Sequence, residues 1–258
     1  MTQTQPPSLF LDAKAMPLEG KDRAMVDAGV FLISQMSSGV FAADNLISFG
    51  KTAGFTSDPD FLRAAEAINQ PALVQRLAWR LHTLCWAARR ALAVEGAFVE
   101  FGVFQGFKSA FLAQYLNFNA LDRDFYLYDT FAGIPERYAA TSPIAPGVHA
   151  QAGLVEYVRK RFSRWPRIRV VQAMVPDEVI PADLPERIAY AHIDMNSAEA
   201  ETGAYELIFE RLSTGATIVL DDYGWEAFSA QKAAADAFFG ARGLPVLELP
   251  TGQGMVIR

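Results

Sequence analysis

Short apolar runs alternate with amphipathic stretches over the C-terminal two thirds of the chain. After Gly96 the apolar runs have the length and composition of strands, and the stretches between them have helical spacing. This alternation is typical of a doubly wound, Rossmann-like α/β fold. Only Pro250, Thr251 and Gly252 separate the last two strands, so we expect these strands to form an antiparallel hairpin. The expected strands are 97–101, 125–129, 168–172, 188–194, 216–221, 245–249 and 253–257, with helices at 106–117, 152–163, 198–212 and 226–241.

Helical spacing dominates the N-terminal third, in which we expect no strand. Asp58 can cap a helix that begins at Pro59, and Pro71 opens a second helix whose leucine stripe runs to Leu92. We therefore divide the chain into an N-terminal helical extension, residues 1–93, and a core, residues 94–258. The core can close its sheet alone, so we expect the extension to act as a lid over the acceptor pocket. We also expect it to contribute to a subunit interface.

The segment between Gly133 and Gly153 carries three prolines and is too long for an ordinary connection, so it is a second candidate lid. It contains His149, for which a catalytic role has no further support. His82 lies in a helical stretch of the N-terminal third and is expected to be structural. His192 lies in an apolar strand, where it is either a core histidine or a catalytic base.

Composition narrows the class of protein. The chain has 258 residues, 51% hydrophobic and 20% charged, which is enough for a full core and unlike a disordered chain. A net charge of −6 argues against nucleic acid as the main partner. The single cysteine, Cys85, excludes an internal disulfide framework. We see no targeting segment and no membrane span, and so expect a cytoplasmic protein.

A glycine turn follows the first strand of the core. Glu100 ends the apolar run, and Gly102 and Gly106 follow before a helix can begin. Dinucleotide-binding proteins use G-x-G-x-x-G here, and Glu100 takes the place of the first glycine. A carboxylate would repel a pyrophosphate and attract the ammonium of an aminoacyl group, which favours S-adenosylmethionine over NAD. Asp129, at the end of the second strand, is then positioned to hold a ribose.

Acidic residues also end two later strands. Asp194 follows the strand at 188–194, and Asp221 and Asp222 follow the strand at 216–221. If these strands are neighbours in a parallel sheet, the three carboxylates converge at one edge. Converging carboxylates favour a hard cation such as Mg²⁺. The alternative is that Asp221 or Asp222 only caps a turn.

Taken together, these motifs resemble the macrocin O-methyltransferase family, which are class I S-adenosylmethionine-dependent enzymes that methylate sugar hydroxyls of natural products. The resemblance covers roughly residues 80–258. The matching segments are Val99-Glu100-Phe101-Gly102-Val103 with Gly106 and Ser109, Tyr128-Asp129-Thr130-Phe131-Ala132-Gly133-Ile134-Pro135, Ile193-Asp194, Asp221-Asp222-Tyr223-Gly224 and Leu249-Pro250-Thr251-Gly252-Gln253-Gly254.

The resemblance assigns roles to individual residues. It implies that Asp194, Asp221 and Asp222 are magnesium ligands and that Asp194 is also a candidate base, alongside His192. One departure stands out, because the family commonly has Asp-x-Asp-x-Tyr where this chain has Asn196 and Ala198 after Asp194. The acceptor therefore need not be a macrolide sugar. The residues implied to bind the methyl donor are Glu100, Gly102, Gly106, Ser109, Asp129 and Phe131.

The sequence thus predicts a homo-oligomeric, Mg²⁺-dependent O-methyltransferase that uses S-adenosylmethionine and acts on a sugar or sugar-bearing small molecule. A metal-independent methyltransferase for another small acceptor is the second reading. A nicotinamide-dependent sugar oxidoreductase and a non-catalytic cofactor-binding protein are the alternatives from other classes. The missing G-x-G-x-x-G motif argues against the oxidoreductase.

Overall fold

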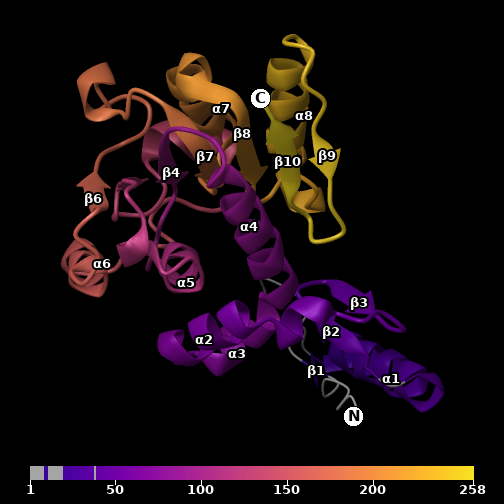
Figure 1. The fold of residues 1–258 in the computed structure, drawn as a ribbon. Coiled ribbons are helices and arrows are strands. Elements are labelled where there is room, and N and C mark those ends of the chain that lie inside the picture. Colours follow the sequence, from indigo (N-terminus) through magenta and orange to yellow (C-terminus); the bar gives the residue numbers. More distant parts are fainter. Residues whose placement is uncertain (1–8, 11–19, 38) are drawn as a thin grey trace. The chain divides into compact units, whose positions relative to one another are not determined.

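A computed structural model describes residues 9–10, 20–37 and 39–258 of the chain (Figure 1). The chain divides into two units, residues 1–82 and 83–258, and each is described by itself. The boundary between them falls inside helix α4 (Ala78–Ala91). In the described part of the chain, no helix combines the length and the apolar character needed to cross a bilayer.

The larger unit is built on a seven-stranded sheet with the order β6-β5-β4-β7-β8-β10-β9 (Figure 1). The first five strands are parallel, and β10 runs antiparallel to both β8 and β9. The expected doubly wound fold with a closing hairpin is therefore confirmed. The strands are β4 (Ala97–Phe101), β5 (Phe125–Asp129), β6 (Ile168–Gln172), β7 (Ile188–Ile193), β8 (Leu212–Leu220), β9 (Leu247–Glu248) and β10 (Gly254–Ile257).

Both faces of the sheet are covered, so the central strand β7 is buried at every position, and its residues are apolar apart from His192. On one face, side chains of β4, β7 and β8 form a core with α7 (Ala198–Ile208) and α8 (Ser229–Gly240). On the other face, Phe98 packs on Phe118, which follows α5 (Phe107–Tyr115). There, Arg90 of α4 also donates to Thr217 Oγ1 of β8 at 2.7 Å. Helix α6 (Leu154–Phe162) precedes the edge strand β6.

Hydrogen bonds continue the parallel sheet beyond the ends of its strands. The bonds join backbone N–H groups to backbone carbonyl oxygens: Gly102 donates to Tyr128 at 3.0 Å, Asp194 to Phe101 at 2.8 Å, and Asp221 to Ile193 at 2.9 Å. The residues just after β4, β7 and β8 are therefore held by the sheet itself. The expected neighbourhood of β7 and β8 is confirmed, with Ile193 paired to Leu220.

The first half of the long segment after Gly133 is packed against the core. It contains the short 3-10 helix η3 (Glu136–Thr141), whose Tyr138 is buried in a cluster with Ile134 and Ala200 of α7. The Tyr138 hydroxyl donates to Asp177 at 2.7 Å. Any lid motion of this segment is thus expected from its second half, where Val148 is exposed.

The N-terminal unit contains a small sheet, so the expectation of no strand in this third was wrong. β1 (Leu9–Phe10) pairs with β2 (Phe41–Ala43), and β2 pairs with β3 (Leu46–Ser48). Asp44 and Asn45 connect β2 to β3, and both have φ of 54°. Positive φ at both central residues is typical of the turn that joins a tight hairpin. The Asp-Asn pair was the available signal.

Helices make up the rest of this unit. They are α1 (Gly20–Met36), η1 (Gly54–Ser57), α2 (Pro59–Ile68) and α3 (Pro71–Arg76), followed by α4. Asp58 caps α2 as expected, accepting from the Asp60 N–H at 2.9 Å. The helix expected from Pro71 to Leu92 is instead interrupted at Leu77, which separates α3 from α4. Phe61 and Trp79 both pack on Phe55, so they serve the core of this unit.

Candidate functional site

The glycine turn between β4 and α5 is required by the packing of the chain itself. Gly102 has φ of 86°, and a Cβ there would lie 1.8 Å from the carbonyl oxygen of Asp194. Gly106 has φ of 71°, and its Cβ would lie 2.6 Å from the ring of Phe162. No other residue fits either position without displacing backbone or a buried ring. The turn therefore brings the start of α5 close to the ends of β4 and β7.

The carboxylate of Asp129 connects two loops at the carboxyl edge of the sheet. Its Oδ2 accepts from the backbone N–H of Val103 at 2.6 Å and of Phe104 at 2.8 Å. Its Oδ1 accepts from the N–H of Phe131 at 2.6 Å. Phe131 is buried and has φ of 53°, which fits the tight turn after β5. Asp129 thus fixes the glycine turn and the loop after β5 relative to each other.

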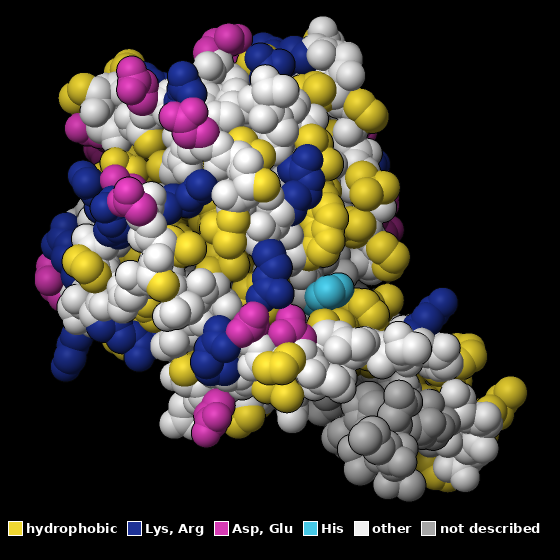
Figure 2. Space-filling view, viewed as in Figure 1, with side chains coloured by type: hydrophobic (Ala, Val, Ile, Leu, Met, Phe, Trp, Pro, Cys, Tyr) yellow, Lys and Arg dark blue, Asp and Glu magenta, His cyan; other side chains and the backbone are white. Residues whose placement is uncertain are grey.

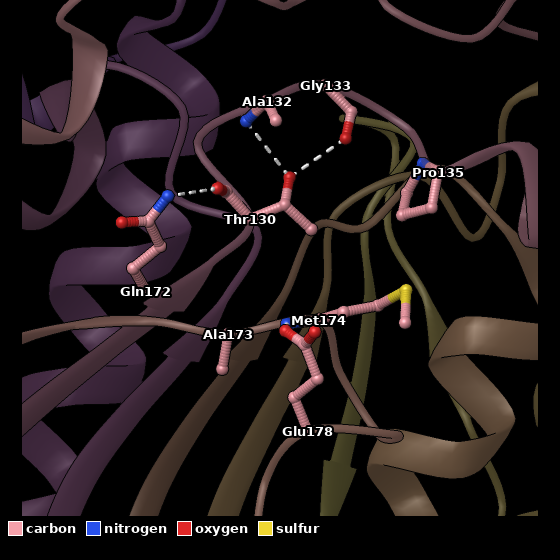
Figure 3. A pocket seen from close by; sticks show the side chains of 8 residues that line it. All are labelled: Thr130, Ala132, Gly133, Pro135, Gln172, Ala173, Met174 and Glu178. Carbon is pink, nitrogen blue, oxygen red and sulfur yellow. Dashed lines mark hydrogen bonds between the residues drawn. The ribbon is translucent and has the colours of Figure 1, made fainter.

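A cavity of about 460 Å³ lies beyond this second loop (Figure 3). Thr130 supports its rim, since its hydroxyl donates to Gly133 and accepts from the Ala132 N–H, while its carbonyl accepts from the Gln172 amide. Figure 3 shows Pro135 and the Met174 side chain on the side of the cavity away from Gln172. The walls therefore combine apolar groups with a few fixed polar groups, which is common in sites for small organic ligands.

A chain of buried polar side chains runs beneath the start of α5. Ser109 donates to Glu100 Oε2, and Glu100 Oε1 contacts His192 Nδ1 at 2.8 Å. His192 Nε2 lies 3.3 Å from Asp221 Oδ1. Burial lowers the pKa of His192, but its hydrogen bonds to Asp221 and Glu100 outweigh this and raise the pKa to about 9. His192 is then an imidazolium at neutral pH, joined to a carboxylate on each side.

Lys108 completes the cluster and was not predicted. It is the second residue of α5, and its Nζ lies 2.6 Å from Asp194 Oδ2 and 2.5 Å from Asp221 Oδ2. Gln253 of the closing hairpin donates to the other oxygen of Asp221 at 3.0 Å. Gln253 lies in the tail segment that carries the family resemblance, and this was its only sequence signal. Asp221 is thus held from α5, β7 and the hairpin at once.

The cluster can be compared with the expected magnesium site. Among the described residues, His192, Asp194 and Asp221 each present one ligand atom, all within 4.8 Å of one another. Asp222 lies outside this group, and its backbone carbonyl accepts from the Trp225 N–H at 3.2 Å. The oxygens suit a hard cation in type. However, the Lys108 ammonium already bridges the two aspartates, so these side chains as they stand do not fit a metal ion between them.

Known proteins resemble this chain in sequence and in fold. The model of the macrocin-O-methyltransferase (TylF) family matches residues 74–246. The chain belongs to this family. Among curated relatives, the 8-demethyl-8-(2,3-dimethoxy-α-L-rhamnosyl)-tetracenomycin-C 4′-O-methyltransferase of Streptomyces olivaceus is 29% identical over 161 residues. The match covers 57% of this chain, which spans only 61% of the length of that relative.

Solved structures show the same fold. The O-methyltransferase NovP is similar with a TM-score of 0.60 at 21% identity, covering 69% of this chain and 79% of NovP. The calicheamicin methyltransferase CalS11 has a TM-score of 0.63 at 17% identity, and the similarity covers 98% of both chains. Its apo structure, described as a TDP-rhamnose 3′-O-methyltransferase, has a TM-score of 0.56 at 18% identity, covering 96% of this chain and 99% of that one.

In this member of the macrocin O-methyltransferase family, the residues expected to form the site fall into two groups, apart from Asp222, which belongs to neither. Gly102, Gly106, Asp129 and Phe131 shape the turns at the carboxyl ends of β4 and β5. Glu100, Ser109, His192, Asp194 and Asp221 form the hydrogen-bonded cluster together with Lys108.

The other two histidines pack against aromatic rings. His149 packs on Phe104 with ring centres 5.1 Å apart. In the N-terminal unit, His82 stacks on Phe55 at 4.6 Å, and burial lowers its pKa.

Proposed function

We propose that the chain transfers a methyl group from S-adenosylmethionine to a hydroxyl of a sugar or of a sugar-bearing natural product. One observation carries this proposal. Asp129 ends β5 and closes the glycine turn, Asp194 follows β7, and these two strands flank β4. A methyl donor bound at Asp129 would therefore be next to an acceptor bound at Asp194. Membership of the family supports the reaction. The activities named for the Streptomyces relative and for CalS11 support a deoxyhexose such as rhamnose as the acceptor.

For the donor site, we propose that Asp129 accepts hydroxyls of the donor ribose in addition to its backbone contacts. The cavity beyond Thr130 and Gly133 is the volume available to an adenine ring. Ser109 donates to Glu100, and Glu100 contacts His192, so Glu100 and Ser109 support the floor of this site. The donor brings an activated methyl group on a sulfonium, and the protein must align the acceptor with it.

We further propose that Asp194 accepts the proton of the acceptor hydroxyl as the new O–CH₃ bond forms. The side chain of Asp194 is 20% exposed and can reach a bound molecule, whereas that of His192 is 1% exposed. His192 lies between the Glu100 and Asp221 carboxylates, so we propose no direct contact between it and the acceptor. Its role is to hold the Glu100 and Asp221 carboxylates.

The magnesium dependence that the resemblance implies stays a prediction. Asp194 and Asp221 offer suitable oxygens, with Asp222 next in the chain, but Lys108 would have to withdraw before an ion could bind between the first two. No step above uses a metal.

Methyl transfer should be assayed with S-adenosylmethionine against TDP-rhamnose, other nucleotide-linked sugars and rhamnosylated aromatic compounds, with mass spectrometry of the products. We expect a gain of one methyl group on a sugar hydroxyl. Asp194→Asn should abolish transfer while calorimetry shows donor binding unchanged, and Glu199→Gln, an exposed carboxyl on α7, is the matched control. If the donor binds but no sugar is methylated, the acceptor class is wrong. Copurified NAD would favour the oxidoreductase instead.

We also propose that the chain forms a homo-oligomer through its N-terminal unit. Helix α1 exposes Met25, Leu32 and Met36 by 63%, 64% and 88%, and Figure 2 shows hydrophobic side chains on the surface of this unit. Apolar side chains gathered on a surface helix are typical of an interface. Sedimentation of the wild type and of a Leu32→Glu, Met36→Glu variant should show dissociation in the variant. A monomeric wild type would contradict the proposal.

The cytoplasmic location stays a prediction.

A further inference from the structure

We propose that Lys108 provides a built-in cation between Asp194 and Asp221, so that methyl transfer by this chain needs no divalent metal. Lys108 would be a positioning residue that holds Asp194 ready to take the acceptor proton. The inference rests on the proposed function, and it selects the metal-independent form of that function.

Two carboxylates hold the Lys108 ammonium. Lys108 Nζ is within 2.6 Å of both aspartate oxygens, and the side chains of Lys108, Asp194 and Asp221 are 17%, 20% and 1% exposed. Charge-assisted hydrogen bonds of this length, shielded from solvent, are strong. Mg²⁺ binds oxygen at about 2.0–2.1 Å. An ion bound to these two oxygens would therefore stand against the ammonium, and the two cations exclude each other.

The position of Lys108 in its helix supports the same conclusion. It stands in the first turn of α5, where the helix dipole disfavours a positive charge. The helix start is fixed by the glycine turn, and the next residue, Ser109, is bound to Glu100. The lysine cannot shift along the sheet without breaking that contact. Its placement is therefore explained by the two carboxylates that it neutralises.

A fixed ammonium performs two tasks that would otherwise fall to a metal ion. It offsets the repulsion between Asp194 and Asp221, which would otherwise disfavour having both ionised at one edge. It also fixes the orientation of the Asp194 carboxylate toward the acceptor. Asp221 is fixed from its other oxygen by Gln253 and faces His192, so Asp194 remains the carboxylate with the greater exposure.

The test uses the full-length protein, Mn²⁺ and Mg²⁺ as probes, and the variants Lys108→Met, Lys108→Arg and Lys108→Met with Asp221→Asn. Lys160→Met, an exposed lysine on α6, is the matched control. Mn²⁺ binding is measured by electron paramagnetic resonance, and methyl transfer is measured with and without EDTA.

For the wild type and Lys160→Met we expect no Mn²⁺ binding below about 1 mM and activity unchanged within twofold by EDTA. Lys108→Met should bind Mn²⁺ at least tenfold more tightly, lose at least 100-fold of its activity in EDTA and recover part of it with Mg²⁺. Lys108→Arg should resemble the wild type, and the double variant should bind no metal.

A wild type that binds Mn²⁺ as tightly as Lys108→Met, or that loses activity in EDTA, would overturn the inference. If Lys108→Met does not fold, Lys108→Arg and the wild type still decide through the same two measurements. If the wild type methylates no sugar, the proposed function fails, and the Mn²⁺ measurements alone decide whether lysine and metal compete.

Discussion

Glu201 is a buried carboxyl group on α7, behind the strand that ends at Asp194. It is 4% exposed and lies 3.0 Å from the Tyr205 hydroxyl, 3.1 Å from Gln231 Nε2 and 3.4 Å from the Met195 N–H. Burial raises the pKa of Glu201 to about 7, because the lowering effect of its hydrogen bonds does not offset the loss of water. Removing its charge should therefore change how stability depends on pH.

The sign and size follow from proton linkage. The folded protein binds this proton more tightly than the unfolded chain, whose pKa is near the ordinary value of 4.5. The stability contributed by the protonated group is complete below pH 4.5, falls as pH rises, and is lost above about pH 7. At about 1.4 kcal/mol for each tenfold change in proton affinity, the loss amounts to roughly 3 kcal/mol. Glu201→Gln keeps the shape and cannot ionise.

Urea unfolding followed by tryptophan fluorescence at pH 5, 6, 7 and 8 gives the free-energy difference between Glu201→Gln and the wild type. We expect this difference to move in favour of the variant by roughly 2.5 kcal/mol between pH 5 and 8, with little of the change above pH 7. Glu206→Gln, an exposed carboxyl on the same helix, is the control and should stay within about 0.5 kcal/mol at every pH. A difference for Glu201→Gln that does not change with pH would refute the reasoning.

Two further predictions concern the donor side of the site. Asp129→Ala should weaken S-adenosylmethionine binding by about 2 kcal/mol or more in calorimetry, because a charged acceptor of several hydrogen bonds is lost; unchanged affinity in a folded variant would remove Asp129 from the site. Gly102→Ala should cost more than about 3 kcal/mol in thermal unfolding, because its Cβ would overlap the Asp194 carbonyl. Gly147→Ala, with similar φ and open space around it, isolates the cost of the backbone angle, and an equal loss in both would contradict the steric argument.

The parallel core could be predicted from the sequence because its strands are apolar runs that helices cover on both sides. The bounds expected for β4, β5 and β6 agree with the structure residue for residue. The small N-terminal sheet could not be read from hydrophobic spacing, because β2 and β3 have three residues each. The break at Leu77 has no proline or glycine to mark it and depends on packing.

Within the site, the strand-end acids were predictable because the carboxyl ends of parallel strands share one edge. Lys108 was not predictable, because a lysine near the start of a helix is usually solvated. Only the conformation of the preceding turn shows that its side chain points toward the aspartates. Glu201 was missed for a related reason, because a glutamate in a helix is usually exposed and its burial depends on how α7 packs with α8. Sequence patterns locate backbone positions, and the reach of long side chains is decided only in three dimensions.

The hydrogen bonds that extend the sheet past β4, β7 and β8 have a consequence for changing the acceptor. Asp194 and Asp221 are held by the sheet. Residues 195–198 follow Asp194 and lead into α7, and the stretch around Val148 is exposed. Exchanging those two segments for their counterparts from another family member should alter which hydroxyl is presented while the donor pocket keeps its affinity. The Asp194 carbonyl makes Gly102 intolerant of any side chain, so a search for new specificities among variants of this chain should leave the strand ends untouched and diversify only what they carry.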